Sequence, residues 1–172
     1  FSQLAALGDF AYINKINSWV KDWMKSNPPY KGVNWTCAQE CSIRILNFFC
    51  SLLILNQNNL NTTQEKFIKC HLRRIALATS YSKSQQNNHA TSEGAALYIG
   101  GLFLEINSVK EGRKWKLMGR KMLEEMSSAL ISRDGSFSQS STNYHRLMLD
   151  TFSLAEIWNK KFSDLPFSEN LK

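Results

Sequence analysis

Apolar residues recur every three or four positions along most of the chain, which is the spacing of one face of an α-helix. Alternation with a period of two, the pattern of strands, is nearly absent. The first predicted helix carries Tyr12, Ile16 and Trp23 and stops at the Asn27-Pro28-Pro29 sequence, since proline cannot continue the hydrogen-bond ladder. Five more main helices are predicted at about 36–55, 63–81, 88–104, 112–132 and 143–162. The fold class is therefore all-α.

The predicted helices differ in how much of their circumference is apolar. Helices 36–55, 88–104 and 143–162 are apolar nearly all round, whereas 63–81 and 112–132 carry a charged face. A helix that is apolar on every side is packed on every side. Alternation of enclosed and half-exposed helices predicts two layers of antiparallel hairpins, a partial (α/α) toroid. No linker divides residues 1–172, so we expect a single helical domain.

Composition narrows the classes of partner. The 172 residues carry a formal net charge of +7, which favours nucleic acid, anionic lipid or acidic polysaccharide. The four cysteines lack a zinc-ligand spacing and are expected to be buried free thiols. No segment is long and apolar enough to predict a membrane span. The chain begins at Phe1 with no leader pattern, so we expect it to be part of a longer protein.

Two polar runs stand between apolar helices, at 85–89 and 134–146. Together they contain an amide, two imidazoles, a phenol and a guanidinium, which is a set suited to removing a proton next to a carboxylate. These groups belong to Asn88, His89, Tyr144, His145 and Arg146.

Each of these residues also has a purely structural interpretation. Asn88 precedes an apolar helix and could be its N-cap, and His89 could simply be packed. Tyr144 could be a core aromatic residue, and its phenol needs nearby positive charge to act as a base or an acid. The residues alone leave both interpretations open.

A polar line also runs along the otherwise apolar helix 36–55. Glu40 and Arg44 are one turn apart, so they could form an ion pair or could face a water-filled cavity. Trp35, just before them, could stack on a sugar ring or pack in the core.

These segments resemble the heparinase II/III-like polysaccharide lyases. The similarity rests on Asn34-Trp35 with 43–48, on Asn88-His89 with Glu93-Gly94 and 97–100, and on a final signature of Lys114-Trp115, Asp134-Gly135 and Tyr144-His145. The order and approximate spacing of these motifs agree through most of the chain. The chain differs from the family pattern at Ser138 and Gln139, where an acidic residue is expected.

The resemblance implies an (α/α)-toroid domain of an enzyme that cleaves uronic-acid-containing glycans by β-elimination. It assigns neutralisation of the substrate carboxylate to Asn88 and proton transfer to Tyr144, with His89 also catalytic. Substrate contacts are expected from Trp35, Glu40, Arg44, His145 and Arg146. The family's β-sandwich domain, with its further histidine and the metal site of some members, is absent from this chain, so we expect no metal or cofactor here and a fragment that is inactive alone. The resemblance favours a periplasmic or secreted protein.

Three other functions are compatible with the residues. A non-catalytic domain that binds acidic glycans is the main alternative. A nucleic-acid binder is favoured only by net charge, and we expect no nucleic-acid partner and no membrane span. A toroid glycoside hydrolase would need paired carboxylates, for which Glu40 and Glu93 are the main candidates.

Overall fold

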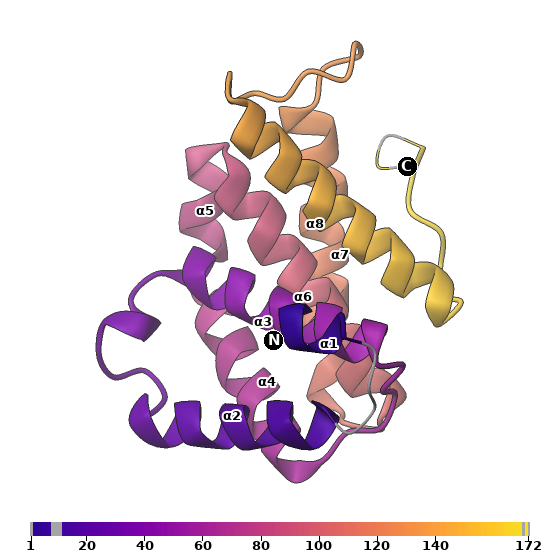
Figure 1. Ribbon diagram of the computed structural model, residues 1–172. Coiled ribbons are helices and arrows are strands. Elements are labelled where there is room, and N and C mark those ends of the chain that lie inside the picture. The colour runs from indigo at the N-terminus through magenta and orange to yellow at the C-terminus, as the bar shows by residue number, and fades with distance from the viewer. Residues whose placement is uncertain (1, 8–11, 170, 172) are drawn as a thin grey trace.

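The computed structural model describes residues 2–7, 12–169 and 171, and most of them are helical (Figure 1). Within these residues no strand forms; Ile131 and Phe137 make an isolated antiparallel bridge. The all-α prediction is confirmed, and the arrangement is compatible with part of a toroid. The elements are α1 (Ser2–Ala5), α2 (Tyr12–Ser26), the 3₁₀ helix η1 (Val33–Trp35), α3 (Ala38–Ile54), α4 (Thr62–Ala76), α5 (Thr79–Gln85), α6 (Asn88–Ile106), α7 (Glu111–Leu130) and α8 (Thr142–Lys161).

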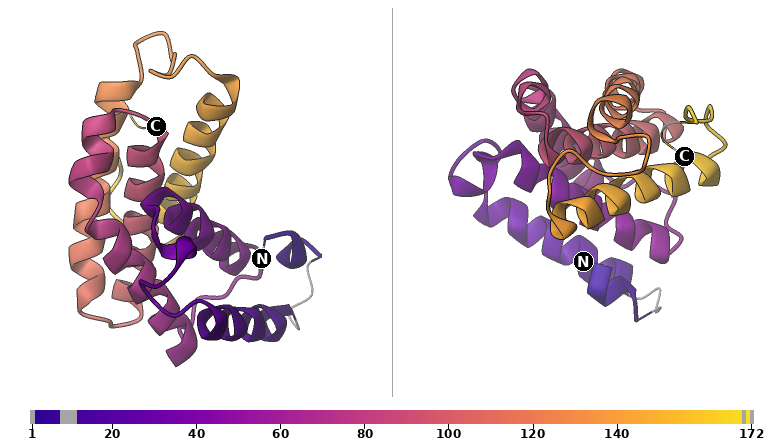
Figure 2. Two further views of the ribbon diagram at one scale, coloured as in Figure 1. Left: turned by 90° about the vertical axis from the view of Figure 1, so that its left-hand side faces the viewer. Right: turned by 90° about the horizontal axis from the view of Figure 1, so that it is seen from above.

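Helix α6 is the centre of the fold. Sixteen of its nineteen residues are buried, as expected for a helix that is apolar all round. It packs against α3, α4, α5, α7 and α8. In Figure 1 the other helices surround it, and α2 lies crosswise to α6 and α7 at the opposite end from the 131–141 loop. Figure 2 shows the same crosswise placement from the side.

Glycines let α6 and α7 approach closely as an antiparallel pair. A Cβ atom built on Gly101 would lie 2.7 Å from the carbonyl oxygen of Gly112, and one on Gly119 would lie 2.6 Å from that of Gly94. Each helix therefore contributes two glycines seven residues apart, which places both on the same face. This close contact fixes the position of α6, whose first residue is Asn88.

Several helix boundaries differ from the sequence prediction. The helix predicted at 63–81 is two helices, because the chain leaves the helical ladder after Ala76 and the Thr79 hydroxyl donates to the Ala76 carbonyl. Asn61 caps α4 through a capping box with Gln64. Helix α8 is also less enclosed than predicted, since the side chains of Leu149 and Ile157 are exposed.

The four cysteines are free, as predicted, but only Cys41 and Cys70 are buried; Cys37 and Cys50 are half-buried. Over the described part of the chain, no helix combines the length and apolar character needed to cross a bilayer.

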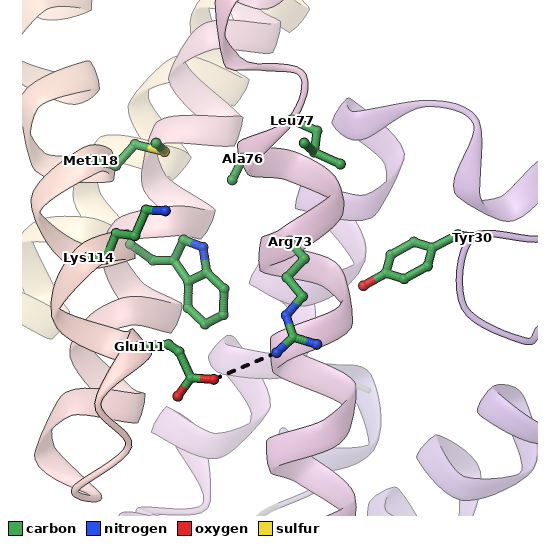
Figure 3. Close-up of a pocket in the computed structure, with 8 residues that line it drawn as sticks. Tyr30, Arg73, Ala76, Leu77, Glu111, Lys114 and Met118 are labelled. Carbon is green, nitrogen blue, oxygen red and sulfur yellow. Dashed lines mark ion pairs between the residues drawn. The ribbon is translucent and has the colours of Figure 1, made fainter.

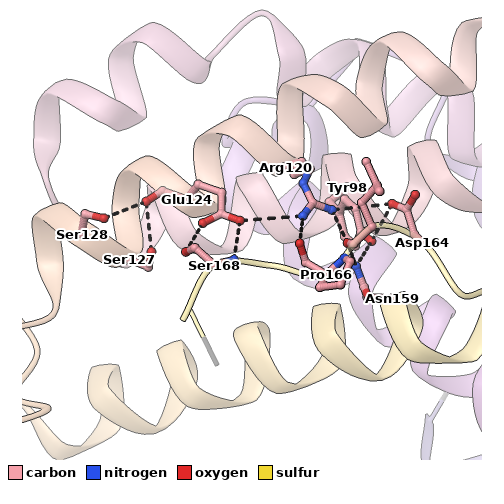
Figure 4. A network of polar contacts seen from close by, with 10 residues as sticks. Tyr98, Arg120, Glu124, Ser127, Ser128, Asn159, Asp164, Pro166 and Ser168 are labelled. Carbon is pink, nitrogen blue, oxygen red and sulfur yellow. Dashed lines mark hydrogen bonds and ion pairs between the residues drawn. The ribbon is translucent and has the colours of Figure 1, made fainter. Parts of the chain in front are cut away.

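The C-terminal segment after α8 runs alongside α7 and is held by a polar network (Figure 4). Asp164 accepts hydrogen bonds from Tyr98 Oη at 3.0 Å and Lys116 Nζ at 3.1 Å. Burial alone would raise the pKa of the Asp164 carboxyl, but these two donors hold it below its usual value. Further along, Ser168 binds the Glu124 carboxylate, so the segment is fixed at two points.

Candidate functional site at the N-terminal end of α6

The two polar runs of the sequence meet at the N-terminal end of α6. Gln86 ends α5 in a left-handed conformation, and Asn87 then caps α6 by accepting a hydrogen bond from the His89 backbone at 2.9 Å. The Asn88 N–H donates to Gln139 Oε1 at 2.9 Å, and the Ser138 hydroxyl donates to the Gln86 carbonyl at 3.4 Å. Residues about fifty positions apart in the chain are therefore in direct contact.

The loop that carries Gln139 has its own local structure. Asp134 Oδ1 accepts from the backbone and hydroxyl of Ser136, and Gly135 adopts a φ of +84° that suits glycine. The Ser138 N–H donates to the Leu130 carbonyl at 2.8 Å and closes the loop onto the end of α7. The Asp134-Gly135 turn thus positions Gln139 at the α6 terminus.

The predicted catalytic residues occupy this end of the molecule with different exposure. Asn88 is 5% exposed, and it is the first residue of the helix rather than its cap, so the capping interpretation was wrong by one position. His89 is half-buried, and burial lowers the pKa of its imidazole, so the neutral ring predominates at pH 7. Tyr144 is 43% exposed on the first turn of α8. The contact between the two polar runs is made by Gln139, not by the Tyr144 side chain.

His145 and Arg146 extend the same end of α8. His145 is half-buried, and its N–H donates to the Ser141 carbonyl at 2.9 Å in the first turn. The Arg146 side chain is exposed. Tyr144, His145 and Arg146 are consecutive residues, so their side chains point to different sides of the helix.

Trp35 and Arg44 belong to an interior cluster instead. Trp35 is 3% exposed and packs against the rings of Trp23 and His71, with its Nε1 donating to the Asn27 carbonyl. Trp35 therefore offers no open ring face for a sugar, which corrects the expectation of a stacking platform.

Arg44 is likewise occupied within the protein. Its guanidinium lies 4.5 Å from the centre of the Trp23 ring, donates to the Asn34 carbonyl at 3.1 Å and contacts His71 Nε2 at 3.2 Å. Arg44 thus turns inward, away from the ion pair considered with Glu40, and joins α3 to α4. Glu40 itself is exposed on the first turn of α3.

A buried carboxyl group lies one turn further along α6. Glu93 is 2% exposed, and its Oε2 atom has no hydrogen-bond partner. Burial raises the pKa of this carboxyl to about 7, against the opposing effects of Ser82 and Arg74. Glu93 is buried, whereas Glu40 is exposed on α3.

The sequence model of the family described as heparinase II/III N-terminus matches residues 4–162. The chain belongs to the heparinase II/III N-terminus family. Neither the curated proteins nor the solved structures that were compared with the chain gave a match. Membership of this heparinase family relates the chain to polysaccharide lyases.

Sequence reasoning missed the two residues that organise this end of the heparinase-family domain. Gln139 was noted only as a departure from the family pattern, and Asn87 was one position before the expected cap. Asn87 could have been found because asparagine is a preferred N-cap residue. Nothing in the local sequence signals that Gln139 reaches α6, since this contact spans 51 residues.

The α6 end can attract an anion. Helix N-termini carry N–H groups and a partial positive charge that attract anions. Here the first three N–H groups of α6 have neutral acceptors: Asn88 donates to Gln139 Oε1, and His89 and Ala90 donate to Asn87. In the part of the chain that the structure describes, no group of three or more His, Cys, Asp or Glu side chains is arranged to hold a metal ion.

Proposed function

We propose that this chain is the helical part of a polysaccharide lyase that cleaves uronic-acid-containing glycans by β-elimination. The observation that carries the proposal is the hydrogen bond between Gln139 and Asn88, because it joins the two signature segments at one anion-attracting helix end in a member of the heparinase II/III family. The net charge of +7 suits an acidic polymer.

In the proposed reaction the sugar loses the proton on the carbon next to its carboxylate. Negative charge then builds on the carboxylate, and hydrogen bonds from the side-chain amide and the backbone N–H of Asn88 stabilise it as an oxyanion hole would. Because the Asn88 N–H now donates to Gln139 Oε1, a bound carboxylate would replace Gln139 as the acceptor. A carbon–carbon double bond forms as the bond from the next carbon to the glycosidic oxygen breaks.

Tyr144 is the proposed proton-transfer group. As a phenolate it takes the proton from the sugar carbon, and as a phenol it returns a proton to the departing glycosidic oxygen, so that protons balance over the cycle. Its exposed position on the first turn of α8 allows contact with a polymer. The neutral His89 imidazole is an additional candidate for moving or accepting a proton.

The experiment supplies the complete protein with a panel of uronate polymers and follows ultraviolet absorbance of the unsaturated chain ends. Asn88→Ala and Tyr144→Phe are expected to lower turnover by about 10²–10⁴-fold, the effect of removing one oxyanion donor or one acid–base group. Tyr81→Phe is the matched control, since Tyr81 is an exposed tyrosine outside both signature segments. Undiminished turnover in Asn88→Ala and Tyr144→Phe would refute the mechanism.

The burial of Asn88 favours a second candidate, a glycan-binding domain without catalysis. In that case binding of uronate oligosaccharides would persist in Tyr144→Phe, and no polymer would yield unsaturated ends. Glycan binding that survives saturating competitor DNA would exclude a nucleic-acid binder.

A further inference from the structure

A pocket lies between α4 and α7 (Figure 3). Its volume is about 590 Å³, within the range of small-ligand sites. α7 contributes Glu111, Lys114, Trp115 and Met118. None of the residues that line the pocket belongs to the polar runs 85–89 and 134–146, so the pocket is separate from the candidate catalytic site.

The pocket has a surplus of positive charge. The Glu111 carboxylate has its closest partner in Lys69 at 2.8 Å, while Arg73 lies 3.6 Å away with more than half of its side chain exposed. Among the described residues Lys114 has no ion-pair partner, and it projects from α7 toward α4 in Figure 3. Lys69 pairs with both Glu65 and Glu111, so Arg73 and Lys114 supply the positive charge that an anion in the pocket could meet.

The floor of the pocket is apolar. Leu77, Met118 and Ala76 line it, together with the small part of Trp115 (6% exposed) that reaches the surface. These apolar groups can pack against the C–H face of a sugar, while the cations at the rim can reach a substituent on that ring.

Tyr30 closes the opposite side. Its ring enters from the loop between α2 and η1 with its hydroxyl toward Arg73 (Figure 3). The backbone of Tyr30 has a φ of +67°, a conformation that non-glycine residues rarely adopt and that occurs often at ligand-binding positions. A strained aromatic residue at the rim supports a binding role for the pocket.

We propose that this pocket is an accessory site that holds one uronate residue of an acidic glycan, with its carboxylate between Arg73 and Lys114 and its ring against the apolar lining formed by Leu77, Met118 and Trp115. The inference rests on the proposed function for its ligand class. Such a site would hold a polymer chain on the protein while another part of the chain occupies the α6 end.

The test follows the Trp115 indole N–H by NMR, in the complete protein, during titration with a glucuronate-containing oligosaccharide. Trp115→Phe identifies the resonance. We expect a saturable shift with the charged oligosaccharide and none with its carboxyl-reduced, neutral counterpart. Lys114→Glu should weaken the binding about tenfold or more, because a charge-assisted contact becomes a repulsive one.

Lys121→Glu is the matched control. This substitution makes the same charge change on α7, but at a largely exposed position that does not line the pocket. The proposal is overturned if the Trp115 resonance does not shift, or if it shifts equally with the neutral analogue or with a DNA oligonucleotide. It is also overturned if Lys121→Glu weakens the binding as much as Lys114→Glu does. Tyr144→Phe separates the two sites: it should abolish turnover and leave the Trp115 shift unchanged. A Trp115 shift in a protein without turnover would refute only the lyase activity.

Discussion

Gly119→Ala is expected to disrupt the packing of α6 against α7. The new methyl group would lie 2.2 Å from the Tyr98 backbone nitrogen and 2.6 Å from the Gly94 carbonyl oxygen. Ordinary contact begins near 3.4 Å, so the helices must separate locally by the difference between 3.4 and 2.2 Å, about 1.2 Å. Both obstacles are backbone atoms of α6, which cannot move aside as a side chain can.

The magnitude follows from two opposing effects. Alanine favours a helix over glycine by about 1 kcal/mol, which alone would stabilise the protein. Overpacking of a close interface costs about 1–3 kcal/mol and occasionally more. Because the obstacles are rigid, we take the upper end of the overpacking cost and expect a net loss of about 2 kcal/mol in the free energy of unfolding. For a domain of this size that corresponds to a fall of about 4–8 °C in Tm.

Thermal unfolding followed by circular dichroism measures this change, and the facing glycine provides the control. A methyl group on Gly94 would meet only the side chains of Met122 and Leu123, at 3.3–3.4 Å. Gly94→Ala should therefore change the unfolding free energy by less than about 1 kcal/mol. The reasoning is refuted if Gly119→Ala is as stable as Gly94→Ala, or more stable than the unmodified protein.

Two further predictions concern buried charges. The folded-state pKa of Glu93, about 7, lies above its ordinary value of 4.5, so this group's contribution to stability is present below pH 4.5 and is lost as the pH rises through 7. Glu93→Gln should therefore raise the free energy of unfolding at pH 8 by about 3 kcal/mol relative to the unmodified protein. It should also remove the pH dependence of stability that Glu93 causes. Denaturation curves at pH 5 and pH 8 measure this, and an equal change with pH in the two proteins would contradict the prediction. Asp164→Asn removes the carboxylate that binds Lys116 and Tyr98. It should lower the free energy of unfolding by about 1–2 kcal/mol and speed hydrogen exchange of the backbone amides in residues 163–168. Unchanged exchange there would show that the network does not hold the segment.

Two of the residues predicted to contact substrate pack inside the protein instead. Substrate contacts were expected from Trp35 and Arg44 because of the family resemblance and the polar line along helix 36–55. They instead pack with Trp23 and His71, where desolvation lowers the pKa of His71 to about 3 and keeps it neutral. Local sequence cannot distinguish these outcomes, because the deciding contacts come from α2 and α4.

The sequence alone determined that the chain is helical, that α6 is enclosed, and that it belongs with the heparinase II/III family. Periodicity of apolar residues reports which face of a helix is buried, and motif order reports ancestry. Only the tertiary structure decided that Gln139 reaches Asn88, that Glu93 is buried without a full set of partners, and that Arg73 and Lys114 share a pocket with Trp115. These are contacts between residues far apart in the chain, and they depend on how closely the helices approach, which the glycines of α6 and α7 allow.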